Sequence, residues 1–382
     1  MRIELSEAQR QLRDAVRAFA RERLAPAAAE IDRRACFPRA QVADLARLGA
    51  LGCFVPERFG GAGFDHVAFA LVMEEVAAGC AATAAVLAAH AALVTSPILA
   101  FGTDAQRARY LPRLASGEWL GCFALGEPGA DAGAIRTTAR RAGDGWVLNG
   151  TKHLVTNAPE ARLALVVATP DAQRERRGLA AFLVETDTPG WQLRRIEEKM
   201  GMRGAVSAEL ALTDVRVPAA GLLGGEGQGL AVAEQALDGA RIGLAAAAVG
   251  IARAAFEATL VYVGARRAFG QRLADFQATQ FRLADMAAAI EAARLLALEA
   301  AFLQDRGVPH AKEAAMAKLY AAETAMTVAT QAVQLHGGYG YTREFPVERH
   351  FRDAKMAALA EGTSASERLA IATHLLREAR AA

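Results

Sequence analysis

The fold is decided by residues 334–364, which read Gln334-Leu-His-Gly-Gly-Tyr-Gly340, Tyr341-Thr-Arg-Glu-Phe-Pro-Val-Glu348, Arg352-Asp-Ala-Lys355 and Ala360-Glu-Gly-Thr-Ser364. Gly337 and Gly338 let the backbone approach a ligand closely and expose amide N–H groups to an anion or a nucleotide. Glycine pairs also end many helices, so the turn by itself fits either role. His336, a lone histidine beside glycines, is interpreted as structural.

Glu361 is the side chain in this stretch that is best suited to acid–base catalysis. A glutamate shielded from water has a raised pKa, because burial disfavours the carboxylate, and such a group can act as a general base. The alternative is that Glu361 caps a helix beginning near Thr363 and favours its positive end. The residues alone favour the cap, and the base is implied only by the family resemblance that Arg352-Asp-Ala-Lys355 helps to carry.

The regions before and after this stretch have a helical period. Long segments without internal proline, rich in Ala, Leu and Arg, predict an antiparallel helical bundle over roughly 228–264, 275–305, 311–336 and 363–380. At the other end, Ser6 can cap a helix through Leu12, Val16 and Phe19. Residues 65–99 are almost wholly apolar, which predicts helices buried on most sides.

Between the helical regions the pattern changes to short β-rich runs separated by turn residues. Residues 146–149, 163–168, 180–185 and 206–212 have the length and composition of strands. They predict a small sandwich or barrel. The expected organisation is mainly α with an inserted β domain: an N-terminal helical domain at 1–118, a middle β domain at 119–222 and a C-terminal helical bundle at 223–382.

Composition narrows the function classes. Lys+Arg of 44 against Asp+Glu of 42 leaves a charge of +2, which gives no reason to expect nucleic acid or an anionic membrane as partner. No stretch reads as a secretion signal or a transmembrane helix, so a cytoplasmic protein is expected. The cysteines are far apart and favour buried thiols over a disulfide frame or a zinc site; they are Cys36, Cys53, Cys80 and Cys122. Lysine is rare, which we interpret as the habit of a GC-rich genome.

The motifs in residues 334–364 resemble the last quarter of the acyl-CoA dehydrogenase family, and the helix, β, helix order resembles it over essentially the whole chain. The resemblance implies an FAD-dependent enzyme in which Glu361 removes the α proton of an acyl thioester and a hydride passes to flavin N5. Arg266-Arg-Ala-Phe-Gly270 resembles the family segment that reaches the FAD of a partner subunit, although alone it reads as a solvated arginine pair on a helix. The FAD-nucleotide candidates implied by position are Arg266, Phe269, Gln277, Gln334, Leu335, Gly337, Gly338 and Thr363.

Two segments in the β region resemble the family's flavin-ring contacts: Cys122-Phe-Ala-Leu-Gly-Glu-Pro128 and Asn149-Gly-Thr-Lys-His-Leu-Val-Thr-Asn157. Without the family they read as a strand end and a hairpin. The implied flavin-edge residues are Phe123, Leu125, Gly126, Leu154, Val155 and Thr156. The implied substrate contacts are Gly362, Asp238 and Arg241; the last two read equally well as charged residues at a helix start.

The chain also departs from the family pattern. Gly126 replaces a threonine at the flavin edge, and Glu127-Pro-Gly-Ala-Asp131 lacks the family's Gly-Ser pair, which contacts the pantetheine arm of the substrate. Leu154 stands where an aromatic ring usually packs on the flavin. Three apolar residues, Ala268, Phe276 and Ala365, stand where the family usually has polar ones. Ala205 and Ser207 depart from the family's Gly-Ser-x-Thr.

Several functional alternatives remain open from the sequence. The acyl group arrives either on coenzyme A or on an acyl carrier protein, as in relatives that serve polyketide or peptide assembly. The chain is otherwise a non-catalytic relative, or an oxidase or oxygenase of the same fold. The resemblance further implies a homodimer or homotetramer, because the FAD site borrows Arg266 and Gln277 from a neighbour. It also implies an electron-transfer flavoprotein as the electron acceptor.

Overall fold

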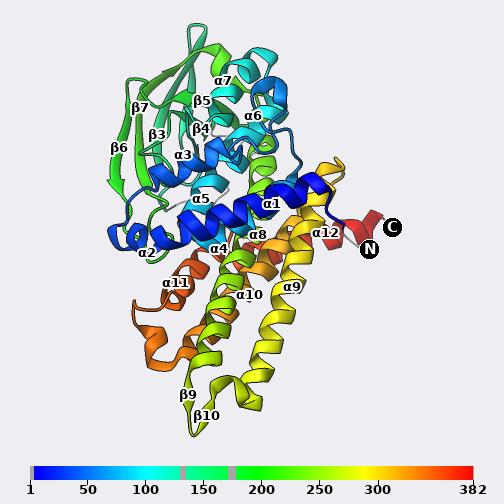
Figure 1. Cartoon of the computed structure of the whole chain (residues 1–382). Helices are drawn as coiled ribbons and strands as arrows, with labels where there is room; N and C mark the ends of the chain where they lie inside the picture. The colour runs from blue at the N-terminus through cyan, green and yellow to red at the C-terminus, as the bar shows by residue number, and fades with distance from the viewer. Residues whose placement is uncertain (1–3, 130–134, 171–177, 382) are drawn as a thin grey trace.

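The structure is a computed structural model that describes residues 4–129, 135–170 and 178–381. A β domain lies at one end of a long helical body, and a small hairpin lies at the opposite end (Figure 1). The N-terminal region is helical, as expected: α1 (Glu7–Phe19), α2 (Ala25–Arg34), α3 (Arg39–Arg47), α4 (His66–Gly79), α5 (Ala81–His90), α6 (Ser96–Phe101) and α7 (Asp104–Ala115), with the π-helical turns η1 (Ala20–Leu24) and η3 (Ala91–Thr95) and the 3-10 turn η2 (Glu57–Phe59).

The first helix begins where the sequence predicts. The Ser6 hydroxyl accepts a hydrogen bond from the Gln9 backbone N–H at 3.2 Å, and the Gln9 side chain accepts one from the Ser6 N–H at 2.8 Å. This reciprocal arrangement satisfies two N–H groups that would otherwise lack partners at the helix start. The prediction of a cap at Ser6 is confirmed.

The middle region is a sandwich of two four-stranded sheets with the strand orders β1-β4-β5-β8 and β2-β3-β7-β6. Among the described strands, β1 and β4 pair in parallel and the other strand pairs are antiparallel. Trp146 packs edge-on against Phe182, with ring centroids 5.4 Å apart, between the two sheets. The strands are β1 (Gly121–Ala124), β2 (Thr138–Ala142), β3 (Gly145–Thr156), β4 (Leu163–Ala168), β5 (Ala180–Glu185), β6 (Trp191–Ile196), β7 (Ser207–Val217) and β8 (Leu222–Leu223), with the 3-10 turn η5 (Ala219–Gly221) before β8.

One strand corrects the sequence interpretation. The hairpin reading of residues 149–157 is wrong, because β3 continues unbroken through Thr156 and pairs with β7 along its length. A bulge between Lys152 and Val155 absorbs the irregular residues. Leu154 there adopts a left-handed φ of 55°, a conformation uncommon for a side chain of this kind.

The C-terminal region is a bundle of α8 (Gly229–Ala265), α9 (Gln277–Asp305), α10 (Ala311–His336) and α12 (Ser364–Ala381), each close to its predicted bounds. α11 (Val347–Ala357) was not predicted. The short strands β9 (Arg267–Ala268) and β10 (Gln271–Arg272) form a hairpin between α8 and α9, so the interpretation of Arg266 and Arg267 as a pair on a helix is wrong. The 3-10 turns η6 (Leu273–Asp275) and η7 (Gly337–Tyr341) complete the region.

Two helical stretches, Ala81–Phe101 and Gly229–Ala265, are long and apolar enough to cross a membrane by length and composition. Within their most apolar windows, 78% and 61% of the residues are buried inside the protein. These stretches therefore pack as core helices of this fold.

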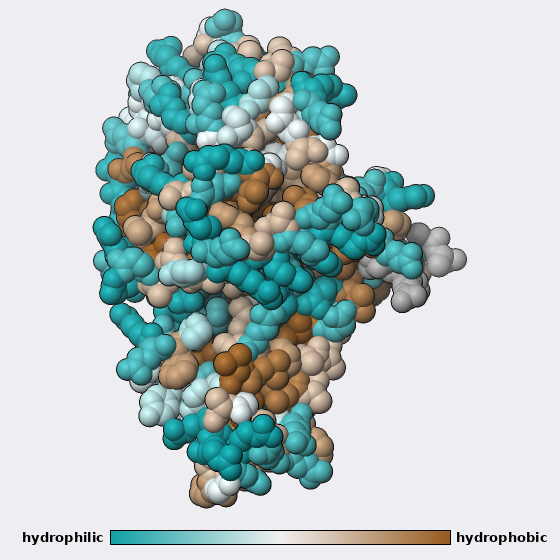
Figure 2. Space-filling view, viewed as in Figure 1, coloured by the Kyte–Doolittle hydropathy of each residue, from teal (hydrophilic) through white to brown (hydrophobic). Residues whose placement is uncertain are grey.

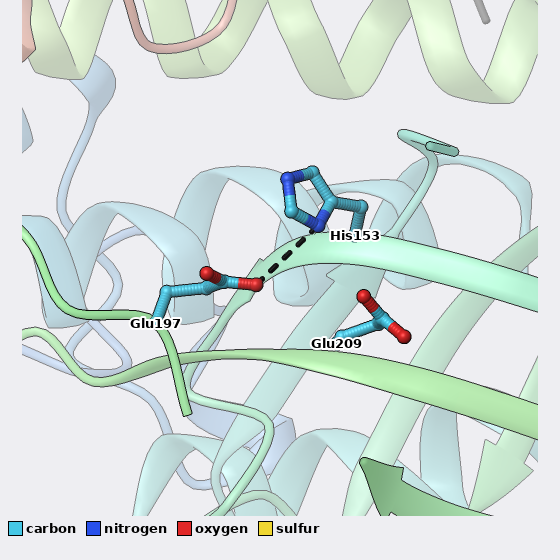
Figure 3. A group of neighbouring side chains, drawn as sticks. All are labelled: His153, Glu197 and Glu209. Atoms are coloured by element: carbon cyan, nitrogen blue, oxygen red, sulfur yellow. Dashed lines mark ion pairs between the residues drawn. The ribbon is translucent and has the colours of Figure 1, made fainter. Parts of the chain in front are cut away.

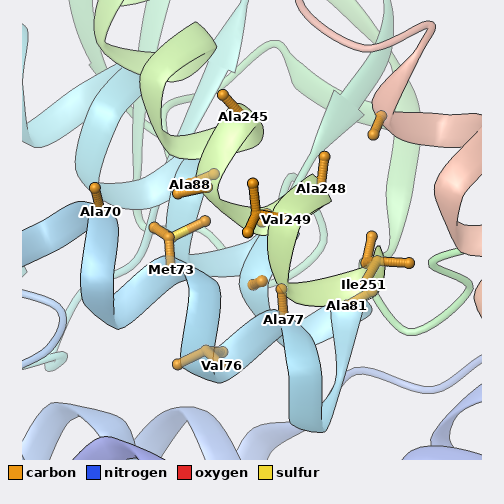
Figure 4. Packing of buried hydrophobic residues seen from close by; sticks show 14 of the residues in the cluster. Ala70, Met73, Val76, Ala77, Ala81, Ala88, Ala245, Ala248, Val249 and Ile251 are labelled. Atoms are coloured by element: carbon orange, nitrogen blue, oxygen red, sulfur yellow. The ribbon is translucent and has the colours of Figure 1, made fainter. Parts of the chain in front are cut away.

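Small residues bring α4, α5 and α8 close together (Figure 4). Met73, Ala77 and Val249 lie in one buried cluster with 0%, 1% and 1% exposure. Gly250 of α8 faces the backbone of α4, where a Cβ at position 250 would lie 2.2 Å from the Glu74 carbonyl oxygen. Only a residue without a side chain permits this contact.

We expect Gly250→Ala to destabilise the protein by about 1–3 kcal/mol, because the new methyl group forces α4 and α8 apart. Gly264→Ala in the same helix is the matched control, since a Cβ at that position meets nothing within 4 Å. It should stabilise the protein by about 0.5–1 kcal/mol through helix propensity. Urea unfolding of both variants measures the difference. Equal free energies of unfolding for the two variants would contradict the close contact.

Candidate active site

Glu361 lies in the turn between α11 and α12, with its backbone in the left-handed region at φ 54°. Its neighbour Gly362 has φ 125°, so two successive residues leave the usual backbone regions. The helix cap is Thr363, whose hydroxyl accepts a hydrogen bond from the Ser366 N–H at 3.2 Å. The alternative in which Glu361 merely caps α12 is therefore wrong. Strained backbone of this kind is a frequent feature of functional sites.

A cluster of buried charges surrounds the Glu361 turn. Arg241 of α8 binds Asp238 at 2.7 Å and Glu367 of α12 at 3.0 Å. Glu367 is 0% exposed. Lys318 of α10 is also buried, and its Nζ donates to the Gly362 carbonyl oxygen. Three helices thus hold the turn in place through side chains far apart in the sequence.

The positions of Asp238 and Arg241 settle one open alternative. α8 begins at Gly229, so both residues lie more than two turns inside the helix. The reading of either one as a charged residue at a helix start is wrong. Their role as substrate contacts remains a prediction.

The environment of Glu361 stabilises its protonated, neutral form relative to the same group in water. Burial raises the pKa of Glu361, while the positive charges of Lys318 and Arg241 oppose that rise. Burial also lowers the pKa of Lys318, which weakens the opposing charge. A carboxylate with a raised pKa is a stronger base than an ordinary glutamate, as removal of a carbon-bound proton requires.

The two predicted flavin-edge segments lie side by side. The His153 N–H donates to the Gly126 carbonyl oxygen at 2.9 Å, which joins the end of β1 to β3. Phe123 is 8% exposed, whereas Leu154 is 54% exposed. Part of the family departure at Glu127-Pro-Gly-Ala-Asp131 lies outside the described residues, since Ala130 and Asp131 are not among them.

A buried ion pair fixes this edge. Lys152 of β3 is 0% exposed and donates from Nζ to Glu127 at 2.8 Å and to the Leu125 carbonyl oxygen at 3.0 Å. Glu127 also accepts hydrogen bonds from the Thr137 hydroxyl at 2.6 Å and from the Arg136 N–H at 2.7 Å. These contacts hold the backbone of residues 125–127 in place.

A second set of contacts connects the flavin edge to α11. The Thr156 hydroxyl lies 3.1 Å from that of Ser207, which in turn accepts from Lys199 Nζ at 3.1 Å. A few residues on, the Met202 N–H donates to the buried carboxyl of Asp353. Burial raises the pKa of Asp353 to about 6. The motif Arg352-Asp-Ala-Lys355 thus anchors the β domain to the helix that precedes Glu361.

The remaining cofactor candidates lie at the far end of the bundle (Figure 1). Arg266 stacks over the Tyr339 ring at 5.5 Å, and Phe269 is 97% exposed. From Arg241 to Arg266 the helix rises about 38 Å at 1.5 Å per residue, so the two groups do not meet within one chain. The candidates in this distal group are Arg266, Phe269, Gln277, Gln334, Leu335, Gly337 and Gly338, and all but Leu335 are exposed.

His336 beside this turn is structural, as interpreted from the sequence. It is 2% exposed, it stacks on Tyr262 at 4.2 Å, and its Nδ1 bonds the Ala332 carbonyl oxygen at 2.8 Å.

Sequence reasoning missed four buried charged residues that shape the site: Glu127, Lys152, Lys318 and Glu367. Lys152 and Lys318 could have been noticed because lysine is scarce in this chain. The chain has lysine only at 152, 199, 312, 318 and 355, and two of these side chains are almost fully buried. In an arginine-rich chain, a retained lysine is a candidate for a specific contact.

A separate group of side chains, His153, Glu197 and Glu209, lies on the sheet near this edge (Figure 3). His153 Nδ1 is 3.4 Å from Glu197. Arg195 contacts Glu197 at 3.0 Å and Glu209 at 3.9 Å. Because a guanidinium already compensates both carboxylates, the group does not carry the charge that a divalent cation needs.

The fold and the site together define a flavin-dependent enzyme acting on acyl thioesters, and the comparisons agree. The acyl-CoA dehydrogenase N-terminal, middle and C-terminal domain models match residues 6–118, 122–215 and 227–376. The chain belongs to the acyl-CoA dehydrogenase family.

The human mitochondrial short-chain specific acyl-CoA dehydrogenase is 47% identical over 380 residues, which cover 99% of this chain and 92% of the relative. Butyryl-CoA dehydrogenase from Megasphaera elsdenii has a TM-score of 0.97 at 39% identity, covering 98% of this chain and 100% of the other. A glutaryl-CoA dehydrogenase from Mycobacterium smegmatis in complex with FADH2 has a TM-score of 0.91 at 33% identity, covering 97% and 95%. The protein is an FAD-dependent acyl-CoA dehydrogenase, an oxidoreductase acting on CH–CH bonds.

The described residues fit FAD. The exposed apolar face of Leu154 beside Thr156 offers surface to a flat ring system, despite the loss of an aromatic side chain there. At the distal end, exposed Phe269 and the guanidinium of Arg266 offer a stacking surface and a phosphate ligand.

Proposed function

We propose that the protein desaturates a short-chain acyl-CoA, with Glu361 as the base that removes the α proton. The observation that carries this proposal is the placement of Glu361: half-buried, with a raised pKa, in a turn held by Lys318, Arg241 and Glu367. A glutamate there receives the proton on its carboxylate, while the thioester carbonyl oxygen accepts a hydrogen bond from the Glu361 N–H. The identity to a short-chain relative supports the chain length.

The chemistry that FAD supplies when bound is acceptance of the hydride that leaves the β carbon. The protein's own residues orient the two reactants. Lys152 and Glu127 hold the backbone at 125–127, and Thr156 offers a hydroxyl from the neighbouring strand. Gly362, where a Cβ would lie 2.1 Å from a Glu367 carboxylate oxygen, lets Glu367 pack against the Glu361 turn.

Anaerobic titration of the flavin-loaded protein tests this function. Butyryl-CoA should bleach the flavin absorbance more completely than a long-chain acyl-CoA, and a butyryl carrier protein should be much less effective. Bleaching by the carrier-bound group alone would replace the proposal with carrier-protein dehydrogenation. No change with any acyl thioester would mean a non-catalytic relative, and rapid reoxidation in air would mean an oxidase.

We further propose that the enzyme is a homodimer or homotetramer, in which Arg266, Phe269 and Gln277 complete the FAD site of a neighbour. Two features support this: the distal group lies far from Glu361 within one chain, and apolar side chains are exposed over the lower bundle (Figure 2). Among them Val261 is 76% exposed and Phe281 61%. Sedimentation of the flavin-loaded protein tests it, and a monomer that keeps FAD would contradict it.

An electron-transfer flavoprotein is proposed as the acceptor, since the enzyme must be reoxidised after each turnover. The test is turnover of butyryl-CoA with this acceptor as the only oxidant. Absence of turnover under these conditions, with normal flavin bleaching, would exclude it.

The pH dependence of kcat/KM should report the environment of Glu361. The base works only when deprotonated, so kcat/KM falls as the pH drops through its pKa. In Glu367→Gln, Arg241 and Lys318 lose a compensating charge and lower the pKa of Glu361. The acid limb should then move to lower pH, by on the order of one unit. Arg368→Gln, on the exposed side of the same helix, is the control. If the acid limb of the kcat/KM profile does not move in Glu367→Gln, the buried charges around the turn do not affect the pKa of Glu361.

A further inference from the structure

A groove of about 380 Å³ lies on the helical body; none of the proposed catalytic or FAD-binding residues lines it, while Val261 of the proposed subunit interface does. It is bordered by α1 and η1, the end of α4, the second half of α8 and the start of α11. Its α8 residues begin at Arg253, about 18 Å along the helix from Arg241. Its volume lies within the usual range of small-molecule sites.

Positive charge dominates the lining. Four arginines line the groove against two glutamates, Glu75 and Glu257, which leaves a net charge of +2. Glu75 is 2% exposed and is already used by two of the arginines: Arg17 binds it at 2.7 Å and Arg253 at 2.6 Å. Arg253 also binds Glu257 at 3.1 Å. Both acidic residues of the lining are therefore already paired with Arg17 or Arg253.

The other two arginines of the lining are not paired with these glutamates. Within the described part of the chain, neither Arg21 of η1 nor Arg349 of α11 has an ion-pair or hydrogen-bond partner for its side chain. Arg21 lies on a π-helical turn, a geometry that recurs at functional sites. Both residues line the groove, and they come from different elements.

A buried histidine also lines the groove without a partner. His350 is 6% exposed, and among the residues that the structure describes neither ring nitrogen makes a hydrogen bond. Burial and the charge of Arg349 lower the pKa of His350 to about 3, so the ring is neutral and offers one donor and one acceptor. The ring nitrogens of His350 are not fully buried, so a ligand in the groove can bond them.

We propose that this groove binds a small phosphorylated molecule, with Arg21, Arg349 and His350 as its ligands. A phosphate monoester is close to a dianion at neutral pH, which matches the net charge of +2. A carboxylate would leave one positive charge uncompensated. Guanidinium donors from two elements suit the several oxygens of a phosphate group.

Calorimetric titration of the flavin-loaded protein with ribose 5-phosphate tests the proposal, with neutral ribose and inorganic phosphate as parallel arms. Ribose 5-phosphate should bind and ribose should not. Arg349→Gln should weaken binding about tenfold or more, and raised salt should weaken it in the native protein. Inorganic phosphate binding as tightly as the ester, with the same loss in Arg349→Gln, would identify free phosphate as the ligand.

Arg343→Gln is the matched control, because Arg343 is exposed and does not line the groove. Equal weakening in Arg343→Gln would overturn the proposal by showing a general charge effect. Displacement of ribose 5-phosphate by butyryl-CoA would place it at the substrate site instead, and absence of binding at millimolar concentration would also overturn it. Melting curves without ligand show whether Arg349→Gln is folded, and His350→Asn gives an independent second variant.

Discussion

Glu361→Gln should abolish flavin reduction by butyryl-CoA while FAD and the thioester stay bound. The amide has the size of the carboxyl group but no basicity, so the loss isolates the proton transfer. Positioned general-base catalysis contributes roughly a hundred- to ten-thousand-fold, and the variant should lose at least that factor. Stopped-flow measurement of flavin bleaching gives the rate, and a binding titration of the thioester gives the affinity.

Two companion variants make the Glu361 result specific. Glu361→Asp keeps the base but shortens it by one methylene group, so part of the rate should remain. Glu323→Gln changes an exposed glutamate that pairs with Arg368, and it should bleach at the native rate. If Glu361→Gln reduces the flavin as fast as the native enzyme does, another residue is the base.

The helical regions were predictable because their signal is local. A 3.6-residue period repeated over many turns marks α8, α9 and α10 without any knowledge of their partners. β2 and β6 were missed for the opposite reason. Their sequences, Thr138-Ala-Arg-Arg-Ala142 and Trp191-Gln-Leu-Arg-Arg-Ile196, carry exposed charges, and they form strands because β3 and β7 offer edges to pair with.

In the candidate site too, residues in local motifs were located from the sequence and residues that act through distant contacts were not. Glu361 was located from a contiguous motif, and the Thr363 cap beside it follows a local rule. Arg241 was expected only as a substrate contact, and its pairing with Glu367, 126 positions away, was missed because it acts across a long separation. Lys318, which reaches Gly362 from another helix, was missed for the same reason. Composition offered only the scarcity of lysine, which was interpreted as genomic habit and not as a site.

Lys152→Met should destabilise the protein by about 3–5 kcal/mol, because it leaves the Glu127 carboxylate buried without its cation. It should also weaken FAD binding, since Lys152 holds the Leu125 carbonyl oxygen at the flavin edge. Urea unfolding followed by circular dichroism gives the stability, and flavin fluorescence gives the affinity. The double variant Lys152→Met/Glu127→Gln removes both charges and should recover part of the stability, as burying a pair and breaking a pair differ in cost.

The pH dependence provides an independent check on the same lysine. Burial lowers the pKa of Lys152 to about 8 in the folded protein, against an ordinary value of 10.5. Between these values the unfolded chain binds more protons, so this residue makes stability rise with pH from about 8 to 10.5. Lys152→Met should lose that rise. Lys312→Met, which breaks an exposed pair with Glu378, should keep the rise and change stability little. If the two lysine variants behave alike, Lys152 does not carry a buried charge.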